Sequence, residues 1–173
     1  DSIAKLRAAV RSGCHAARLT ETAAQAVDEI FQKAGALALQ ELGPAPAPFT
    51  LLAVGSIGRR EPSLVSDQDT CLLYDDSAGN RSWFESFGAA VTALCHQAGL
   101  PPCPKNHTAA NPAWILSFSE WKGRFESWIR QAEPEALLEV NIYFDFRPVF
   151  GDAGWDIRLR RHIFDLVQNR PVF

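Results

Sequence analysis

Two short apolar segments separated by a glycine turn constrain the fold of this chain more than any other feature. Residues 49–54 (FTLLAV) form a continuous apolar run, which is typical of a strand covered on both faces. Residues 70–74 (TCLLY) form a second run of this kind, closed by turn-forming residues 75–80. Gly55 and Ser56 follow the first run directly. The sequence therefore predicts two buried strands, the first ending in a tight turn that opens a short helix.

Helical periodicity dominates the rest of the chain. Residues 3–42 carry apolar side chains at helical spacing, with a break at Gly13, an expected helix cap at Thr20 and a proline-rich end at residues 43–48. Further helices are expected over residues 83–98, from a capping box at 117–120 to about 131, over 155–167, and as one more turn over 135–139. Residues 140–146 alternate as a third strand, and residues 100–112 form a proline-rich loop.

These elements predict an α/β or α+β fold. We expect a small mixed sheet with helices around it. An N-terminal helical segment (residues 1–43) would precede a compact unit over residues 49–173. The length of 173 residues suits one domain. Because the chain begins at Asp1 and has no methionine, we expect it to be an internal piece of a longer protein.

Composition excludes several classes of function. The formal net charge of −3 gives no support to nucleic-acid binding by overall charge. No apolar run approaches the roughly 18 residues of a membrane span, and the first residues lack the pattern of a secretory signal. The four cysteines show no CxxC spacing, so we expect free thiols and a cytoplasmic location.

The chemistry-bearing residues gather around the two strands. Gly55 lets a ligand approach the backbone, and the Ser56 hydroxyl adds a donor where helix N–H groups suit a phosphate. Asp67 and Asp69 precede the second strand, and strand periodicity places both carboxylates on one face. Such a pair is costly unless a hard cation such as Mg²⁺ holds it. Taken singly, an Asp-x-Asp is usually solvated and a Gly-Ser is usually a plain turn.

Asp145 is a third carboxylate that needs a partner. It lies between two phenylalanines in an aromatic run, where an unpaired charge is not tolerated. Arg147, two residues on, would face the same side of a strand and is the ordinary partner. A metal site shared with Asp67 and Asp69 is the functional alternative.

These residues resemble the nucleotidyltransferase superfamily of DNA polymerase beta, whose signature is a Gly-Ser turn followed by an Asp-x-Asp strand. More narrowly, residues 55–61 and 66–69 look like the nucleotidyltransferase domain related to the N-terminal part of bacterial PII-protein uridylyltransferase, which often accompanies CBS and cyclic-nucleotide-binding domains. The similarity continues over roughly residues 20–155. It includes Cys103, Pro104, residues 110–114, Glu120, Trp121, Phe125, Trp128, Ile129 and residues 144–149.

The resemblance implies a metal-dependent enzyme that moves a nucleoside monophosphate from an NTP to a hydroxyl acceptor, including hydroxyls on proteins, as in uridylyl- or adenylyltransferases. It implies Mg²⁺ or Mn²⁺ as the metal, and an acceptor protein or adjoining regulatory domains as partners, with neither membrane nor nucleic acid. Its catalytic and metal residues would be Asp67, Asp69 and Asp145. Its nucleotide-binding residues would be Gly55, Ser56, Gly58, Arg59 and Arg147. Residues 105–108 (KNHT) depart from the family pattern and put the choice of acceptor in doubt.

Other readings stay open. The chain could be a regulatory module of a signal-transduction protein that binds a nucleotide without turning it over, since binding does not require transfer. A zinc site at Cys95, His96, Cys103 and His107 is disfavoured, because neighbouring residues of a helix point to different sides. Aromatic residues recur at helical spacing from Trp114 to Trp128 and indicate a buried helix face. Arg158, Arg160 and Arg161 form a basic cluster that is either a solvated face or a docking site for an acidic partner.

Overall fold

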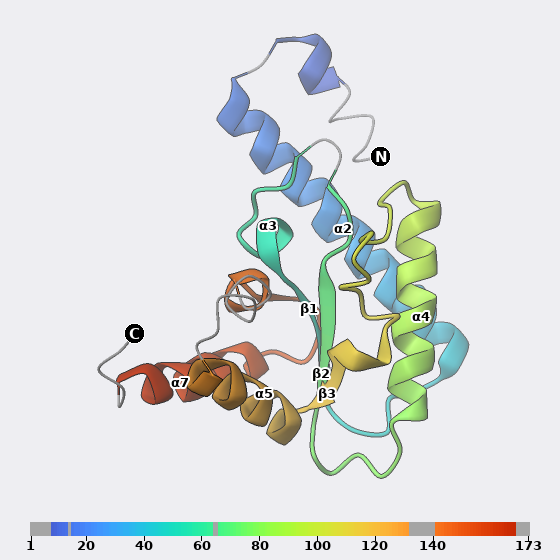
Figure 1. The fold of residues 1–173 in the computed structure, drawn as a ribbon. Coiled ribbons are helices and arrows are strands. Elements are labelled where there is room, and N and C mark those ends of the chain that lie inside the picture. The colour runs from blue at the N-terminus through green and yellow to red at the C-terminus, as the bar shows by residue number, and fades with distance from the viewer. Residues whose placement is uncertain (1–7, 14, 64–65, 132–140, 169–173) are drawn as a thin grey trace.

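A four-stranded sheet lies between two pairs of helices. The computed structural model describes residues 8–13, 15–63, 66–131 and 141–168 (Figure 1). The strands are β1 (Phe49–Ala53), β2 (Thr70–Tyr74), β3 (Ile115–Ser117) and β4 (Arg147–Gly151). The helices are α2 (Ala16–Leu42), α3 (Gly55–Gly58), α4 (Ser82–Gln97), the 3₁₀ turn η1 (Pro112–Trp114), α5 (Phe118–Gln131) and α7 (Trp155–Gln168).

The sheet is mixed, as the sequence predicts. Its strand order is β3-β2-β1-β4, with β1 antiparallel to both of its neighbours and β2 parallel to β3. Every residue of β1 and β2 is buried, which confirms the prediction of two strands covered on both faces. The fold is therefore a small α+β fold with a mixed sheet and helices on both faces.

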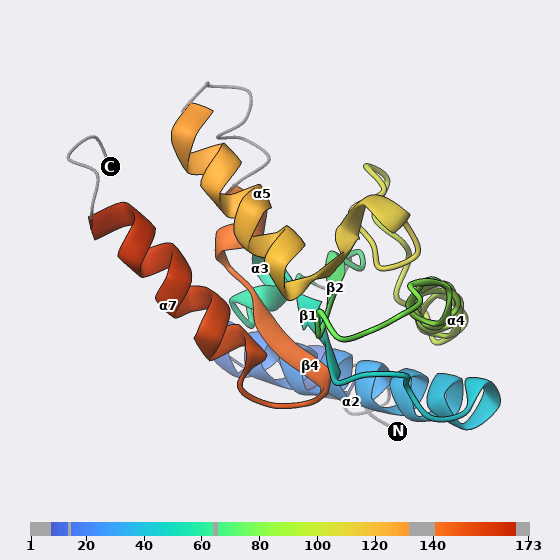
Figure 2. The same ribbon diagram turned by 90° about the horizontal axis from the view of Figure 1, so that it is seen from below.

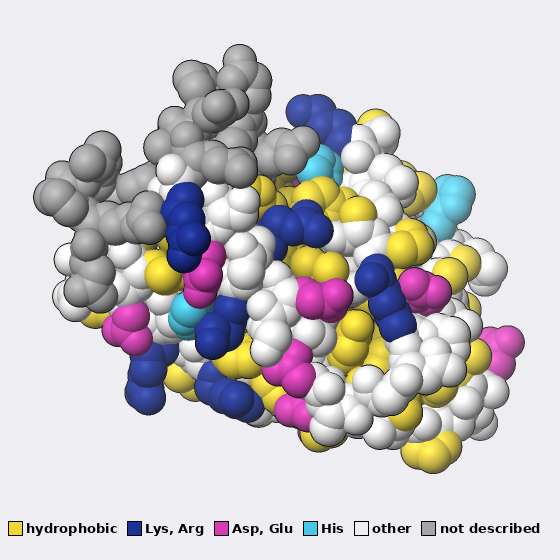
Figure 3. Space-filling model, turned by 60° about the horizontal axis from the view of Figure 1, so that its bottom comes forward, with side chains coloured by type: hydrophobic (Ala, Val, Ile, Leu, Met, Phe, Trp, Pro, Cys, Tyr) yellow, Lys and Arg dark blue, Asp and Glu magenta, His cyan; other side chains and the backbone are white. Residues whose placement is uncertain are grey.

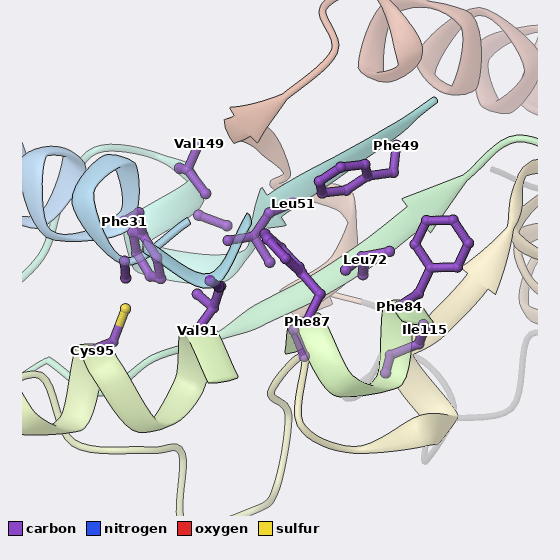
Figure 4. Packing of buried hydrophobic residues seen from close by; sticks show 14 of the residues in the cluster. Phe31, Phe49, Leu51, Leu72, Phe84, Phe87, Val91, Cys95, Ile115 and Val149 are labelled. Carbon is purple, nitrogen blue, oxygen red and sulfur yellow. The ribbon is translucent and has the colours of Figure 1, made fainter. Parts of the chain in front are cut away.

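Alternating side chains of the central strands feed two separate cores. Leu51 and Leu72 face the core under α2 and α4, together with Phe31 and Phe87 (Figure 4). The next residues along the strands face the opposite core, under α5 and α7 (Figures 1 and 2). The aromatic residues of α5 fill that second core, as their helical spacing predicts, and the Trp121 indole donates a hydrogen bond to the Leu72 carbonyl at 3.0 Å.

The long helix α2 shares the first core with the sheet. Phe31 and Ala38 are fully buried in it, and Gln32 donates a hydrogen bond to the Val149 carbonyl of β4. The helix begins at Ala16, so the prediction of Thr20 as its cap is wrong. Thr20 lies within the first turns, where its hydroxyl donates to the Ala16 carbonyl at 3.2 Å. Gly13 ends the preceding helical turn with φ 64°, as the sequence predicts.

The capping box at the start of α5 is confirmed. The backbone N–H of Ser117 donates to Glu120 at 2.7 Å, and the backbone N–H of Glu120 donates to the Ser117 hydroxyl at 3.3 Å. Helices α4 and α7 lie within one residue of their predicted bounds. After the predicted loop over residues 100–112, the structure adds the three-residue strand β3, which the sequence did not predict.

The prediction of a strand over residues 140–146 is wrong. Residues 141–144 are helical, and the strand β4 begins only at Arg147. Helical spacing lets Tyr143 and Phe146 both enter the second core, and this packing outweighs the strand preference of an aromatic run. Pro148 is tolerated in β4 because that strand lies at the edge of the sheet. The expected turn over residues 135–139 lies outside the described residues.

Candidate active site

The turn after β1 brings the predicted phosphate loop beside the carboxylate pair. Gly55 has φ 60°, a conformation that side chains with a Cβ rarely adopt, so the tight turn requires glycine here. Ile57 is fully buried and anchors the short helix α3, while Ser56 is half-buried. The backbone N–H of Val54 donates to the Asp69 carbonyl at 3.0 Å, which extends the pairing of β1 with β2. The turn and Asp69 are therefore immediate neighbours.

Asp67 and Asp69 lie together, as their spacing predicts. One carboxylate oxygen of each and the Cys103 Sγ lie within 4.8 Å of one another, and all three residues are half-buried. A Cβ built on Gly55 would lie 3.5 Å from Asp69 Oδ2. The carboxylate pair thus opens directly onto the glycine turn.

The electrostatics of the pair suit a hard cation. Burial raises the pKa of Asp69, and the nearby charge of Asp67 adds to this, whereas a hydrogen bond from Cys103 opposes it. Burial, followed by the hydrogen bond to Asp69, raises the pKa of Cys103 to about 11, so at neutral pH the residue is a thiol that donates to Asp69. Two carboxylates side by side supply the oxygen ligands that hard divalent cations prefer.

Cys103 is the neighbour of the pair that sequence reasoning missed. A single bridge between Gln68 and Pro102 brings the loop after α4 alongside the carboxylates. The buried Gln68 side chain donates to the carbonyls of Thr92 and Leu100, which holds that loop in place. The sequence signal for this contact was Gln68, a polar residue between two aspartates. The sequence does not show which groups Gln68 binds.

Asp145 has a different partner from the one expected. Its Oδ2 lies 2.7 Å from a terminal nitrogen of Arg59, and the Nε of Arg59 lies 3.1 Å from Glu61. The expected pairing with Arg147 is wrong, because helical residues 141–144 and the following turn direct the two side chains apart. The Asp145 backbone packs against α3, since a Cβ on Gly58 would lie 1.9 Å from its carbonyl oxygen. Asp145 is thus beside the turn, held by an exposed arginine.

Arg147 instead belongs to a group of charges under α3. It donates to the Ile57 carbonyl at 3.1 Å and to Asp28 of α2 at 2.5 Å. Asp28 also accepts from Arg60 at 2.5 Å. Arg60 has φ 61°, an unusual conformation for a residue with a side chain. Asp28 therefore ties the N-terminal helix to the residues just after α3 and to the start of β4.

Replacing Asp28 by asparagine should lower the free energy of unfolding by about 1–3 kcal/mol, because two charge-assisted hydrogen bonds weaken together. Urea denaturation measures the change. The matched control is Glu41→Gln, an exposed acidic residue in the last turn of the same helix. Equal stability of the two variants would show that Asp28 does not hold the turn.

The loop over residues 103–109 includes the segment that departs from the family pattern. It contacts both the start of β2 and Tyr143 of the second core. The His107 carbonyl accepts from the Thr70 N–H at 3.0 Å, and its buried ring lies 2.8 Å from the Tyr143 hydroxyl. Burial raises the pKa of Asp69, and the positive charge of Lys105 partly opposes this rise. Among the described residues Cys95 is buried in the first core and does not join Cys103, so the disfavoured zinc grouping is not assembled. Cys71, Cys95 and Cys103 are free thiols, as expected.

A small mixed sheet whose first strand ends in a Gly-Ser turn beside an aspartate pair defines a domain of the nucleotidyltransferase class. A family model described as "Putative nucleotidyltransferase DUF294" matches residues 2–135, and the chain belongs to this family. The match includes the glycine turn, Asp67 and Asp69, whereas Asp145 and Arg147 lie beyond it. No curated protein matches the chain significantly. None of the described helices is long and apolar enough to cross a bilayer.

Proposed function

We propose that the domain is a metal-dependent nucleotidyltransferase that moves a nucleoside monophosphate from an NTP to a hydroxyl acceptor, a class that includes hydroxyls on proteins. The observation that carries the proposal is the contact between the glycine turn and the Asp67–Asp69 pair, whose ligand atoms lie within 4.8 Å of each other and of Cys103. Phosphate and metal must meet at one point for this chemistry, and these two features are neighbours.

In this proposal Asp67 and Asp69 hold Mg²⁺ or Mn²⁺. The metal would neutralise charge on the transferred phosphate. The Ser56 hydroxyl and the N–H groups of the turn at Gly55 and Gly58 would bind the triphosphate, together with the exposed Arg59 that follows the turn. Arg147 would support the turn from beneath through the Ile57 carbonyl, as its contacts favour.

Asp145 would accept the proton of the attacking hydroxyl. The new bond joins the acceptor oxygen to the α-phosphorus, the bond between the α-phosphorus and the bridging oxygen breaks, and pyrophosphate leaves. Asp145 is bound to Arg59 at 2.7 Å in the nucleotide-free protein. We expect the phosphates to draw Arg59 away and so free the carboxylate for this role.

The same ion pair favours a second candidate, a regulatory module that binds nucleotide without turning it over. If Arg59 never leaves Asp145, the third carboxylate is unavailable and transfer stops at binding. Partners would then be adjoining regulatory domains in place of an acceptor. A cytoplasmic location suits either candidate, because the described cysteines are free thiols.

Pyrophosphate release separates the two candidates. The protein is incubated with each of ATP, CTP, GTP and UTP labelled at the α-phosphate, with Mg²⁺ or Mn²⁺. We expect metal-dependent release of pyrophosphate and transfer of label to water or to protein hydroxyls. Binding of nucleotide without release under any metal would support the regulatory module and contradict transfer.

A further inference from the structure

The outer face of α7 exposes two large apolar side chains. Ile157 is 61% exposed and Phe164 is 60% exposed. Seven residues separate them, which is about two helical turns, so they lie on one side of the helix. The opposite side of α7 buries Trp155, Leu159 and Ile163 in the second core. Helix α7 therefore buries one apolar face in the second core. Its outer face carries a second apolar feature, the ridge formed by Ile157 and Phe164.

The ridge lies between two hollows. One, of about 350 Å³, opens between α5 and α7 and is lined by Lys122, Arg158, Arg161 and the ridge residue Ile157. The other, of about 370 Å³, is mostly apolar and lies on the other side, where Phe164 is part of the lining. A ridge between two concave surfaces is suited to interdigitation with side chains of a facing helix.

The cations beside the ridge are held in place. The Arg158 guanidinium lies 4.6 Å from the Phe118 ring and 4.4 Å from the Trp155 ring. Arg160 lies 4.2 Å from the Phe146 ring and donates to the Phe146 carbonyl. Figure 3 shows basic side chains, with acidic ones among them, beside apolar surface on one face of the molecule. Since the whole chain has a net charge of −3, this basic surface is local.

We propose that the outer face of α7 docks an acidic amphipathic helix of a partner protein. The partner's apolar side chains would pack on Ile157 and Phe164, and its carboxylates would meet Arg158 and Arg161. Charge complementarity selects an acidic partner. An anionic membrane fits less well, because a bilayer has no side chains to fill the concave surfaces beside the ridge.

The start of the docking face is remote from the carboxylate pair. Strand β2 begins next to Asp69, and β3 runs parallel to it, so α5 begins at the far end of the sheet. The ring contact between Phe118 and Trp155, at 5.5 Å, places the start of α7 there too. The other end of the face lies beside Asp145, because the two phenylalanines that flank this residue line the second hollow. The inference itself does not depend on the proposed transfer reaction.

The test uses a fluorescent synthetic helix with leucine at every third and fourth position and glutamate elsewhere, and a matched peptide with lysine in place of glutamate. We expect fluorescence anisotropy to show salt-sensitive binding of the glutamate peptide and not of the lysine peptide. Ile157→Asp and Phe164→Asp should each weaken binding roughly tenfold. Leu37→Asp, at a 53% exposed leucine on α2, should leave binding unchanged.

Charge reversal sharpens the test. Arg161→Glu should lose the glutamate peptide and gain affinity for the lysine peptide. The proposal is overturned if the two peptides bind alike, if the α7 variants bind as well as Leu37→Asp, or if no glutamate peptide binds. Binding to phosphatidylserine vesicles that depends on the same residues, or a dimer that Phe164→Asp dissociates, would also overturn it in favour of a membrane or a second copy of the chain.

Discussion

Asp67→Asn and Asp69→Asn should each abolish metal-dependent nucleotide transfer, with a loss of about a thousandfold or more, because each removes one anionic ligand from a two-carboxylate site. The fold should survive, since asparagine has nearly the same shape. Turnover is measured as pyrophosphate release under saturating metal. The matched control is Asp75→Asn at the opposite end of β2, which should retain activity.

Asp69→Asn carries a second expectation, for stability. Because burial raises the pKa of Asp69 in the folded protein, folding favours the protonated form. The contribution of this group to stability therefore declines as the pH rises from its ordinary pKa through the raised one. At neutral pH without metal, the Asp69→Asn protein should melt at the same temperature as the wild type or higher.

Retained turnover in a clean preparation of either aspartate variant would contradict the assignment of the pair.

Gly58→Ala should destabilise the fold by about 1–3 kcal/mol or more, because the new methyl group meets backbone that cannot turn aside. A Cβ at this position would lie 1.9 Å from the Asp145 carbonyl oxygen and 3.1 Å from that of Ala53. Relief of the clash requires α3 and the segment carrying Asp145 to separate. Nucleotide transfer should therefore be lost along with stability.

Gly123→Ala is the matched control for this change. Gly123 is exposed on α5 and a Cβ there meets nothing within 4 Å, so alanine should stabilise the helix by about 0.5–1 kcal/mol. Urea denaturation of the two variants gives changes of opposite sign if the account is right. A Gly58→Ala protein as stable as the wild type would show that the close approach of α3 to Asp145 is not required.

Local patterns predicted the two central strands and the carboxylate pair because both features depend on short-range rules. Burial of β1 and β2 follows from continuous apolar runs, and alternation along a strand places Asp67 near Asp69. The capping box at Ser117 and Glu120 is likewise a local exchange of hydrogen bonds. These features need no knowledge of the rest of the chain.

Long-range partners escaped the sequence. Residues 141–144, in the aromatic run before Arg147, are helical because helical spacing lets Tyr143 and Phe146 both pack in the second core. The alternating pattern of the sequence does not show this packing. Asp145 pairs with Arg59, a residue 86 positions earlier, instead of its neighbour Arg147. Cys103 reaches Asp69 only because a loop from α4 pairs with Gln68. Each of these depends on tertiary packing.

The sharpest test of the proposed metal site is calorimetric titration of ATP and UTP into the wild type and into Asp69→Asn. Each titration is done with and without Mg²⁺. We expect the wild type to bind nucleotide only when metal is present, because the Asp67–Asp69 pair supplies the metal site beside the glycine turn. We expect Asp69→Asn to lose this binding. Binding of equal strength to both proteins without metal, or no binding of either nucleotide to the wild type, would contradict it.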